Sequence, residues 1–259
     1  MIGELRLFFI ALQFLTRVPV PRWVGFEPEW LNRSARYFPA VGLCVGGVAA
    51  AVLAAVHAPF GPMVAVGLSM AASVLLTGAF HEDGWADTCD ALGGAVDRDR
   101  ALAIMKDFRI GAYGAVGLVL MLGLKAATLA SMPLAWAVPA LLLGHTASRA
   151  AAVALIRWLP YAGDIEHAKA KPMAQRVSLA GVIVAAGSVV MLSGAIALHA
   201  PGQAPAAVVA PLLALVGAGR CAAWLHRRLG GYTGDALGAT QQITELLVLL
   251  GWLALARAA

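Results

Sequence analysis

Long apolar stretches alternate with short polar ones along most of this chain. A bilayer core about 30 Å thick is crossed by roughly 20 helical residues, because an α-helix rises about 1.5 Å per residue. Six stretches have that length and are mostly apolar: 37–57, 61–80, 111–131, 134–158, 178–199 and 205–225. A seventh, 243–257, is shorter and carries Glu245. The pattern therefore predicts six to seven membrane-spanning helices.

The N-terminal segment is apolar but differs from these stretches. Residues 1–20 contain Glu4, Arg6 and Arg17, and prolines follow at the end of the segment. Charges and prolines disfavour a continuous span, so we expect an amphipathic or re-entrant helix here. A signal peptide is not expected, because no small-residue cleavage site follows.

Composition agrees with the membrane interpretation. The chain is 61% hydrophobic and only 13% charged, with a mean hydropathy of +0.80. Soluble domains carry about twice that charged fraction, so a soluble protein of 259 residues is excluded. No linker is long enough to separate two domains. We expect one all-α domain over residues 1–259, a polytopic integral membrane helical bundle.

The basic residues predict the orientation of the bundle. Twelve Lys and Arg residues lie in four of the polar connections, 21–36, 81–110, 159–177 and 226–241. None lies in the alternate connections, 58–60, 132–133 and 200–204. Short cytoplasmic loops retain Lys and Arg, so all four polar connections are predicted to face the cytoplasm. Topology thus explains the net charge of +5, and no nucleic-acid partner is expected.

Half of the acidic residues lie in one stretch. Seven of the fourteen Asp and Glu residues fall between Glu82 and Asp107, directly after an apolar run. If the sequence HEDGWADTCD is helical, Asp83, Asp87 and Asp90 share one face, where they repel each other by a few tenths of a kcal/mol per pair. A solvated acidic helix start would explain one or two carboxylates, but not three in register. Oxygen ligands favour Mg²⁺ or Mn²⁺ over zinc, so we expect a metal site of these three residues with Glu82 beside them.

Other polar groups accompany these acids. His81 precedes them and has two interpretations that the sequence leaves open, a general acid or base and a capping partner without chemistry. The motif IMKDFRIGAYG returns Lys106, Asp107 and Arg109 to the same membrane face, which suits a site for metal and phosphate, although mixed charges there are often only solvated. Arg149 lies mid-span, where a charge is costly and indicates a functional residue facing the bundle interior.

The last polar connection is rich in glycine and in hydrogen-bonding side chains. Its sequence, RRLGGYTGDALGATQQITEL, predicts a flexible backbone able to approach a ligand closely. A plain connecting loop is the alternative. The polar density favours substrate binding, by Tyr232, Thr233, Asp235, Gln241 and Gln242.

These motifs together resemble a known family. HEDGWADTCDALGG, then IMKDFRIGAYG, then GGYTGDALGATQQITEL are similar to the cobalamin synthase family, also called adenosylcobinamide-GDP ribazoletransferase, in that family's order. The early FLTRVPVP and YFPAVGL also resemble its opening segments, so the likeness runs from about Phe8 to Glu245. Small departures at Phe80, Trp85 and Phe108 bear on the pocket lining and not on the acids.

The resemblance implies a Mg²⁺-dependent enzyme of the bacterial inner membrane, multi-pass, with its active site facing the cytoplasm. It would join α-ribazole or its 5′-phosphate to adenosylcobinamide-GDP and release GMP, with membrane lipid and a possible homo-oligomer as further partners. Phosphoryl transfer depends mostly on positioning and charge neutralisation, which suits metal held by the acids and phosphates paired with Lys106, Arg109 and Arg149. The base remains open among Asp87, Asp107 and His81.

Two other functions compete with this one. Clustered Asp residues at a membrane face also suit a CDP-alcohol-type lipid phosphotransferase, but this chain lacks the DGxxAR arrangement of those enzymes. A secondary transporter would be expected to hold its acids at mid-span and to show paired broken helices. Here the carboxylates lie in a polar connection and the buried charge is basic, which counts against a transporter.

Overall fold

The computed structural model describes residues 2–25, 27–163 and 174–258. Within these ranges the chain is helical, and the only β-type pairing is an isolated bridge between Tyr161 and Tyr232. Two lysines from the charge count, Lys169 and Lys171, lie outside the described residues.

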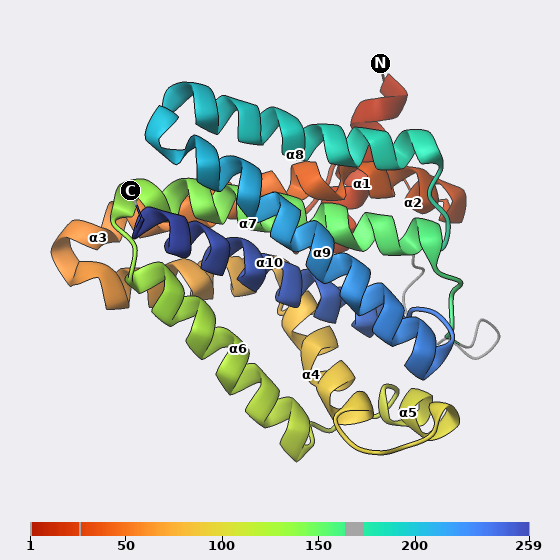
Figure 1. Ribbon diagram of the computed structural model, residues 1–259. Helices are drawn as coiled ribbons and strands as arrows, with labels where there is room; N and C mark the ends of the chain where they lie inside the picture. The colour runs from red at the N-terminus through yellow and green to blue at the C-terminus, as the bar shows by residue number, and fades with distance from the viewer. Residues whose placement is uncertain (1, 26, 164–173, 259) are drawn as a thin grey trace.

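Six helices are long and apolar enough to cross a membrane. They are α3 (Phe38–Thr77), α6 (Ala112–Ala130), α7 (Leu134–Trp158), α8 (Leu179–His199), α9 (Ala204–Leu229) and α10 (Gly234–Ala256). Figure 1 shows them as a bundle, with α6 diverging from the others at one end. The prediction of a polytopic helical bundle is confirmed.

Helix α3 contains both of the first two predicted spans. Its 40 residues reverse direction at Gly61, which has a left-handed φ of 75°. The Ser69 hydroxyl donates to the carbonyl of Ala49 at 2.7 Å, whereas 20 residues of straight helix would separate them by about 30 Å. Figure 1 shows the orange ribbon folding back on itself. With both arms counted, the bundle contains seven long helical segments.

Small residues bring α3 against α7. A Cβ added to Gly42 would collide with the carbonyl oxygen of His145, and one added to Gly46 would lie 3.0 Å from that of Leu141. The two backbones therefore touch at glycines four residues apart, as is common where membrane helices pack through small residues.

The four polar connections meet at one end of the bundle. Arg98 donates through Nε to the Leu229 carbonyl at 2.8 Å and through Nη2 to the Ala162 carbonyl at 3.3 Å. The backbone N–H of Gln175 donates to the Asn32 side chain at 2.8 Å. These bonds join residues from all four basic connections. The structure therefore places the four connections at the same end of the bundle.

The N-terminal segment forms short helices at this end. They are α1 (Ile2–Leu15), η1 (Arg22–Val24), α2 (Pro28–Ser34) and η2 (Ala35–Tyr37). The 14 residues of α1 reach about 21 Å, too short for a bilayer core. Arg6 of α1 donates to the Trp23 carbonyl at 3.2 Å, which ties the segment down. This length fits the expectation that the N-terminal helix does not cross the membrane.

Three further helices complete the fold: α4 (Phe80–Leu92), α5 (Arg98–Ile104) and η3 (Pro201–Gln203). The predicted flexible loop at 226–241 is wrong, because α9 continues to Leu229 and α10 begins at Gly234. Thr233 caps α10 by accepting from the Ala236 N–H at 3.2 Å, and a Cβ added to Gly238 would lie 3.3 Å from the His81 carbonyl oxygen of α4. Capping and packing override the glycine content.

Candidate active site

The acidic helix α4 leaves α3 through a left-handed turn. Gly78 has φ 72° and Ala79 has φ 59°, and Ala79 is the only non-glycine residue with positive φ in the described chain. The Arg17 N–H donates to the Leu76 carbonyl at 2.8 Å, and its guanidinium fills the space that a side chain at Gly78 would need. The turn needs glycine at position 78, and the N-terminal segment holds it in place.

The acids share one face of α4, as predicted. The helix begins at Phe80, so Asp83, Asp87 and Asp90 lie within one narrow arc. Trp85 and Thr88 lie on the opposite face by the same spacing. Asp83 is exposed and Asp87 is partly buried, so a ligand can approach the acidic face from outside the bundle.

Asp235 adds a fourth carboxylate from another helix. Helix α4 crosses the start of α10 at Gly84, where an added Cβ would lie 2.9 Å from the Asp235 carbonyl oxygen. Burial, together with the negative charges of Asp235, Asp83 and Asp90, raises the pKa of Asp87 to about 7. Sequence spacing alone found the α4 acids but missed that Asp235 joins them.

The acidic face presents carboxylate oxygens, the ligand type that magnesium prefers. Within the described residues no group of three or more His, Cys, Asp or Glu side chains is close enough to hold a metal ion alone. Mg²⁺ in proteins usually takes one or two carboxylates, several waters and substrate phosphates. Asp83 and Asp87 supply oxygen ligands, and their repulsion favours a bound cation. The metal itself stays a prediction.

Asp90 has a different role from its neighbours. Its Oδ2 accepts from the Gly111 N–H at 2.7 Å and its Oδ1 from the Gly114 N–H at 2.8 Å. It therefore caps the start of α6 from another helix, and a side chain at either glycine would collide with its carboxylate. Both oxygens bind backbone, whereas the sequence assigned Asp90 to the metal.

His81 is turned toward the bundle interior. It is 5% exposed and packs edge-to-face with Phe80. Burial lowers the pKa of His81 well below its usual value, and the nearby charge of Arg149 lowers it further. The imidazole is therefore neutral at physiological pH, and it lies away from the acidic face.

Asp107 and Arg109 pair with each other on the surface. Arg109 Nη2 lies 2.6 Å from Asp107 Oδ2, and the Arg109 N–H donates to Asp107 Oδ1 at 3.1 Å. These bonds hold the pKa of Asp107 at about 2. Lys106 lies in the same segment between α5 and α6. Lys106, Asp107 and Arg109 thus lie at the polar end of the bundle that carries the acids, as the motif predicted.

A buried polar network connects α4 with the bundle interior. Lys125 Nζ donates to Glu245 Oε1 and to Gln242 Oε1, each at 2.7 Å. Gln242 Nε2 donates to Glu82 Oε1 at 3.0 Å. Glu82 thus faces the network and not the Asp83 side of α4. The buried ion pair explains how α10 carries Glu245 inside an apolar span.

Arg149 and Gln241 belong to the same network. Arg149 Nη1 donates to the His145 carbonyl at 3.0 Å, and His145 Nδ1 lies 3.2 Å from Glu245 Oε2. Gln241 Nε2 donates to the Ser148 hydroxyl at 3.0 Å and also bonds Glu245. Arg149 faces the interior, as predicted, and is 2% exposed. Arg149, Gln241 and Gln242, which the sequence assigned to substrate binding, therefore lie in one buried polar network.

Tyr232 and Thr233 hold the connection before α10. Tyr232 is fully buried, donates to the Ala174 carbonyl at 3.4 Å and packs edge-to-face on Tyr161. The Thr233 hydroxyl caps α10 and contacts the sulfur of Met105 at 3.5 Å. Both side chains stabilise the polar end next to Asp235.

Fold and site together define a polytopic helical membrane protein with an acidic, oxygen-rich site at the polar end of its bundle. The chain belongs to the cobalamin-5-phosphate synthase family, whose family model matches residues 7–253. The resemblance carried by the motifs is confirmed, and so is the expectation of an enzyme.

Curated relatives cover nearly the whole chain. An adenosylcobinamide-GDP ribazoletransferase of Leptothrix cholodnii is 57% identical, over 98% of this chain and 97% of the relative. Enzymes of the same name from Shewanella amazonensis and Vibrio cholerae are 45% and 43% identical, each over 95% of this chain and over 94% and 93% of the relative. No solved structure matches the chain.

Proposed function

We propose that this protein transfers the adenosylcobinamide phosphoryl group from its GDP-activated form to a ribose hydroxyl of α-ribazole or of α-ribazole 5′-phosphate. The products are adenosylcobalamin, or its 5′-phosphate, and GMP. The observation that carries the proposal is the gathering of Asp83, Asp87 and Asp235 from two helices at the polar end of the bundle. The names of the relatives support the choice of substrates.

The reaction needs a proton acceptor. A bond forms between the ribose oxygen and the phosphorus that carries the cobinamide, the bond to the GMP oxygen breaks, and the hydroxyl proton passes to a base. Asp107 is a weak base, because Arg109 holds its pKa at about 2. His81 faces the bundle interior. The geometry therefore favours Asp83 or Asp87 as the proton acceptor.

Asp235 and whichever of Asp83 and Asp87 does not accept the proton would hold Mg²⁺, together with water and substrate phosphate. When bound, the ion would neutralise pyrophosphate charge during transfer. Lys106 and Arg109 lie on the segment that leads into α6, whose start is fixed by Asp90 of α4. The Arg109 side chain is 88% exposed, so it can exchange Asp107 for a phosphate.

We place the site at the cytoplasmic face of the bacterial inner membrane. The support is the distribution of Lys and Arg among the connections between spans, with twelve in the four polar connections and none in the alternate ones. All four of these connections meet at the end of the bundle that carries the acids. GDP-activated substrates would reach the site from that side.

The direct test is a transfer assay. Purified protein receives adenosylcobinamide-GDP, Mg²⁺ and either α-ribazole or its 5′-phosphate, and chromatography follows GMP and the corrinoid product. We expect both products in equal amounts, with loss of the reaction in EDTA. CDP-diacylglycerol with an alcohol is the control pair. Release of CMP from the control pair, without GMP from either ribazole, would reject the proposal in favour of lipid phosphotransfer.

A further inference from the structure

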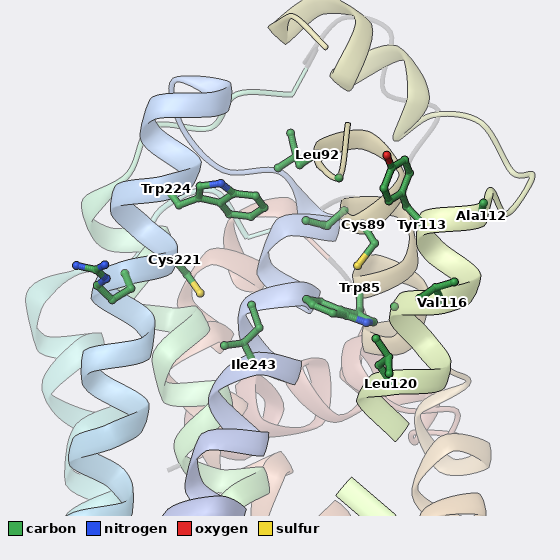
Figure 2. Close-up of a pocket in the computed structure, with 14 residues that line it drawn as sticks. Trp85, Cys89, Leu92, Ala112, Tyr113, Val116, Leu120, Cys221, Trp224 and Ile243 are labelled. Atoms are coloured by element: carbon green, nitrogen blue, oxygen red, sulfur yellow. The ribbon is translucent and has the colours of Figure 1, made fainter. Parts of the chain in front are cut away.

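An apolar cavity of about 710 Å³ lies between α4, α6, α9 and α10. Aromatic side chains from three helices line it, Trp85 of α4, Tyr113 of α6 and Trp224 of α9. Figure 2 shows these rings around the same space, with Ile243 of α10 below Trp224 in the view. Its volume is within the range of small-molecule sites.

One threonine in the cavity wall has an unusual environment. The Thr88 hydroxyl is buried and has no hydrogen-bond partner, and the side chain is 1% exposed. Every threonine of the long helices that the structure describes, and Thr16 directly after α1, donates to the carbonyl four residues earlier; the helical ones are Thr77, Thr128, Thr146, Thr240 and Thr244. Thr88 therefore does not make the usual bond, and Thr88 is one of the residues that form the cavity wall.

The neighbouring indole of Trp85 also has a donor without a partner among the described residues. Trp85 Nε1 is also buried without a hydrogen-bond partner in the described chain, and Trp85 lines the same cavity. A buried donor without a partner costs about 1–3 kcal/mol. Two such donors in one apolar cavity indicate a ligand with a hydrogen-bond acceptor. A hydrocarbon chain would fill the volume but leave both donors unsatisfied.

The cavity meets the acidic site at one place. It lies on the face of α4 opposite Asp83, but Gly93 and Ala112 in its wall are close to where Asp90 caps α6. This is the polar end of the bundle. A ligand inside the cavity would thus direct its outer part toward the carboxylates.

We propose that this cavity holds the aromatic base of the ribazole substrate. Ribazole is a nucleoside of dimethylbenzimidazole, a flat apolar ring system with one free ring nitrogen that accepts a hydrogen bond. The base stacks between the aromatic side chains, and its ring nitrogen accepts from Thr88 or from Trp85. The ribose then extends past Asp90 toward the acidic face. This inference rests on the proposed function and adds the place where the acceptor substrate is held.

The test measures the KM of each of the two substrates separately. Thr88→Val removes the hydroxyl at nearly constant volume, and Trp85→Phe removes the N–H and keeps a ring. Each variant should raise the KM for α-ribazole about five-fold, the effect of one lost hydrogen bond, and leave the KM for adenosylcobinamide-GDP unchanged. Thr128→Val is the matched control, because that hydroxyl bonds only its own helix. Its two KM values should equal those of the wild type.

Equilibrium dialysis supplies a readout without turnover. The wild type should bind α-ribazole alone, free dimethylbenzimidazole should compete, and both variants should bind about five-fold more weakly. Unchanged KM and binding in both variants, with normal GMP release, would reject the cavity and keep the proposed function. Phospholipid that co-purifies with the wild type, is lost from the variants and is not displaced by α-ribazole would assign the cavity to an acyl chain. Binding of α-ribazole without GMP release would instead keep the cavity and reject the function.

Discussion

The carboxylate of Asp90 accepts a hydrogen bond from the backbone N–H of Gly114 at 2.8 Å, although the two residues lie on different helices. The Gly111 N–H binds the other oxygen of the same carboxylate. The acid thus compensates the unpaired N–H groups at the start of α6 and attaches that helix to α4. Two acids of the shared face, Asp83 and Asp87, keep their oxygens available for other partners.

We predict that Asp90→Asn affects stability more than metal dependence. Asparagine keeps one acceptor oxygen but loses the charge and presents an NH₂ group to a donor. The free energy of unfolding should fall by about 1 kcal/mol, with a Tm lower by about 2 °C in detergent. The Mg²⁺ concentration that gives half-maximal activity should stay as in the wild type. A large increase in that concentration would show that Asp90 is a metal ligand after all.

The opposite result is expected for the two free acids. Asp83→Asn and Asp87→Asn should each lower kcat at least about 100-fold while the protein inserts and purifies normally. Asp99→Asn is the control, because the Asp99 side chain is 92% exposed and lies outside the acidic face. Rates of GMP release at saturating Mg²⁺ measure the effect. Full activity in either α4 variant would remove that residue from the site.

Hydropathy was sufficient to predict most of the fold. The predicted span 134–158 coincides with α7, whose start follows Pro133 and whose end precedes Pro160. The two arms of α3 were also expected, as the separate apolar stretches 37–57 and 61–80. The start of α10 was missed, because hydropathy cannot show that Gln241 and Gln242 are buried by bonding one another and Glu82.

The candidate site was only partly predictable. Helical spacing correctly placed Asp83 and Asp87 on one face, since that relation is local. The proximity of Asp235 depends on two helices crossing at Gly84, and the capping role of Asp90 depends on where α6 begins. Both are tertiary relations between segments far apart in sequence, and spacing within one helix carries no signal for them.

The raised pKa of Asp87 predicts a pH-dependent stability in EDTA. Folding raises this pKa from 3.8 to about 7, so the folded protein binds the proton more tightly than the unfolded chain. The free energy of unfolding should therefore fall as the pH rises from about 4 to about 7. Asp87→Asn removes this dependence and should have a higher Tm than the wild type near pH 8, with little difference near pH 4. A lower Tm for the variant at both pH values would contradict the prediction.

The ion pair between Lys125 and Glu245 predicts a specific coupling inside the bundle. Both side chains are buried, so Glu245→Gln would leave the ammonium without its counterion and should lower the free energy of unfolding by about 3 kcal/mol. Adding Lys125→Met should restore most of the loss, because the double variant no longer buries an unpaired charge. Thermal unfolding of the two single variants and the double variant in one detergent measures the coupling. If the two losses simply add, the pair does not stabilise the fold, and Glu245 must then act through Gln241 and His145, which bond its other oxygen.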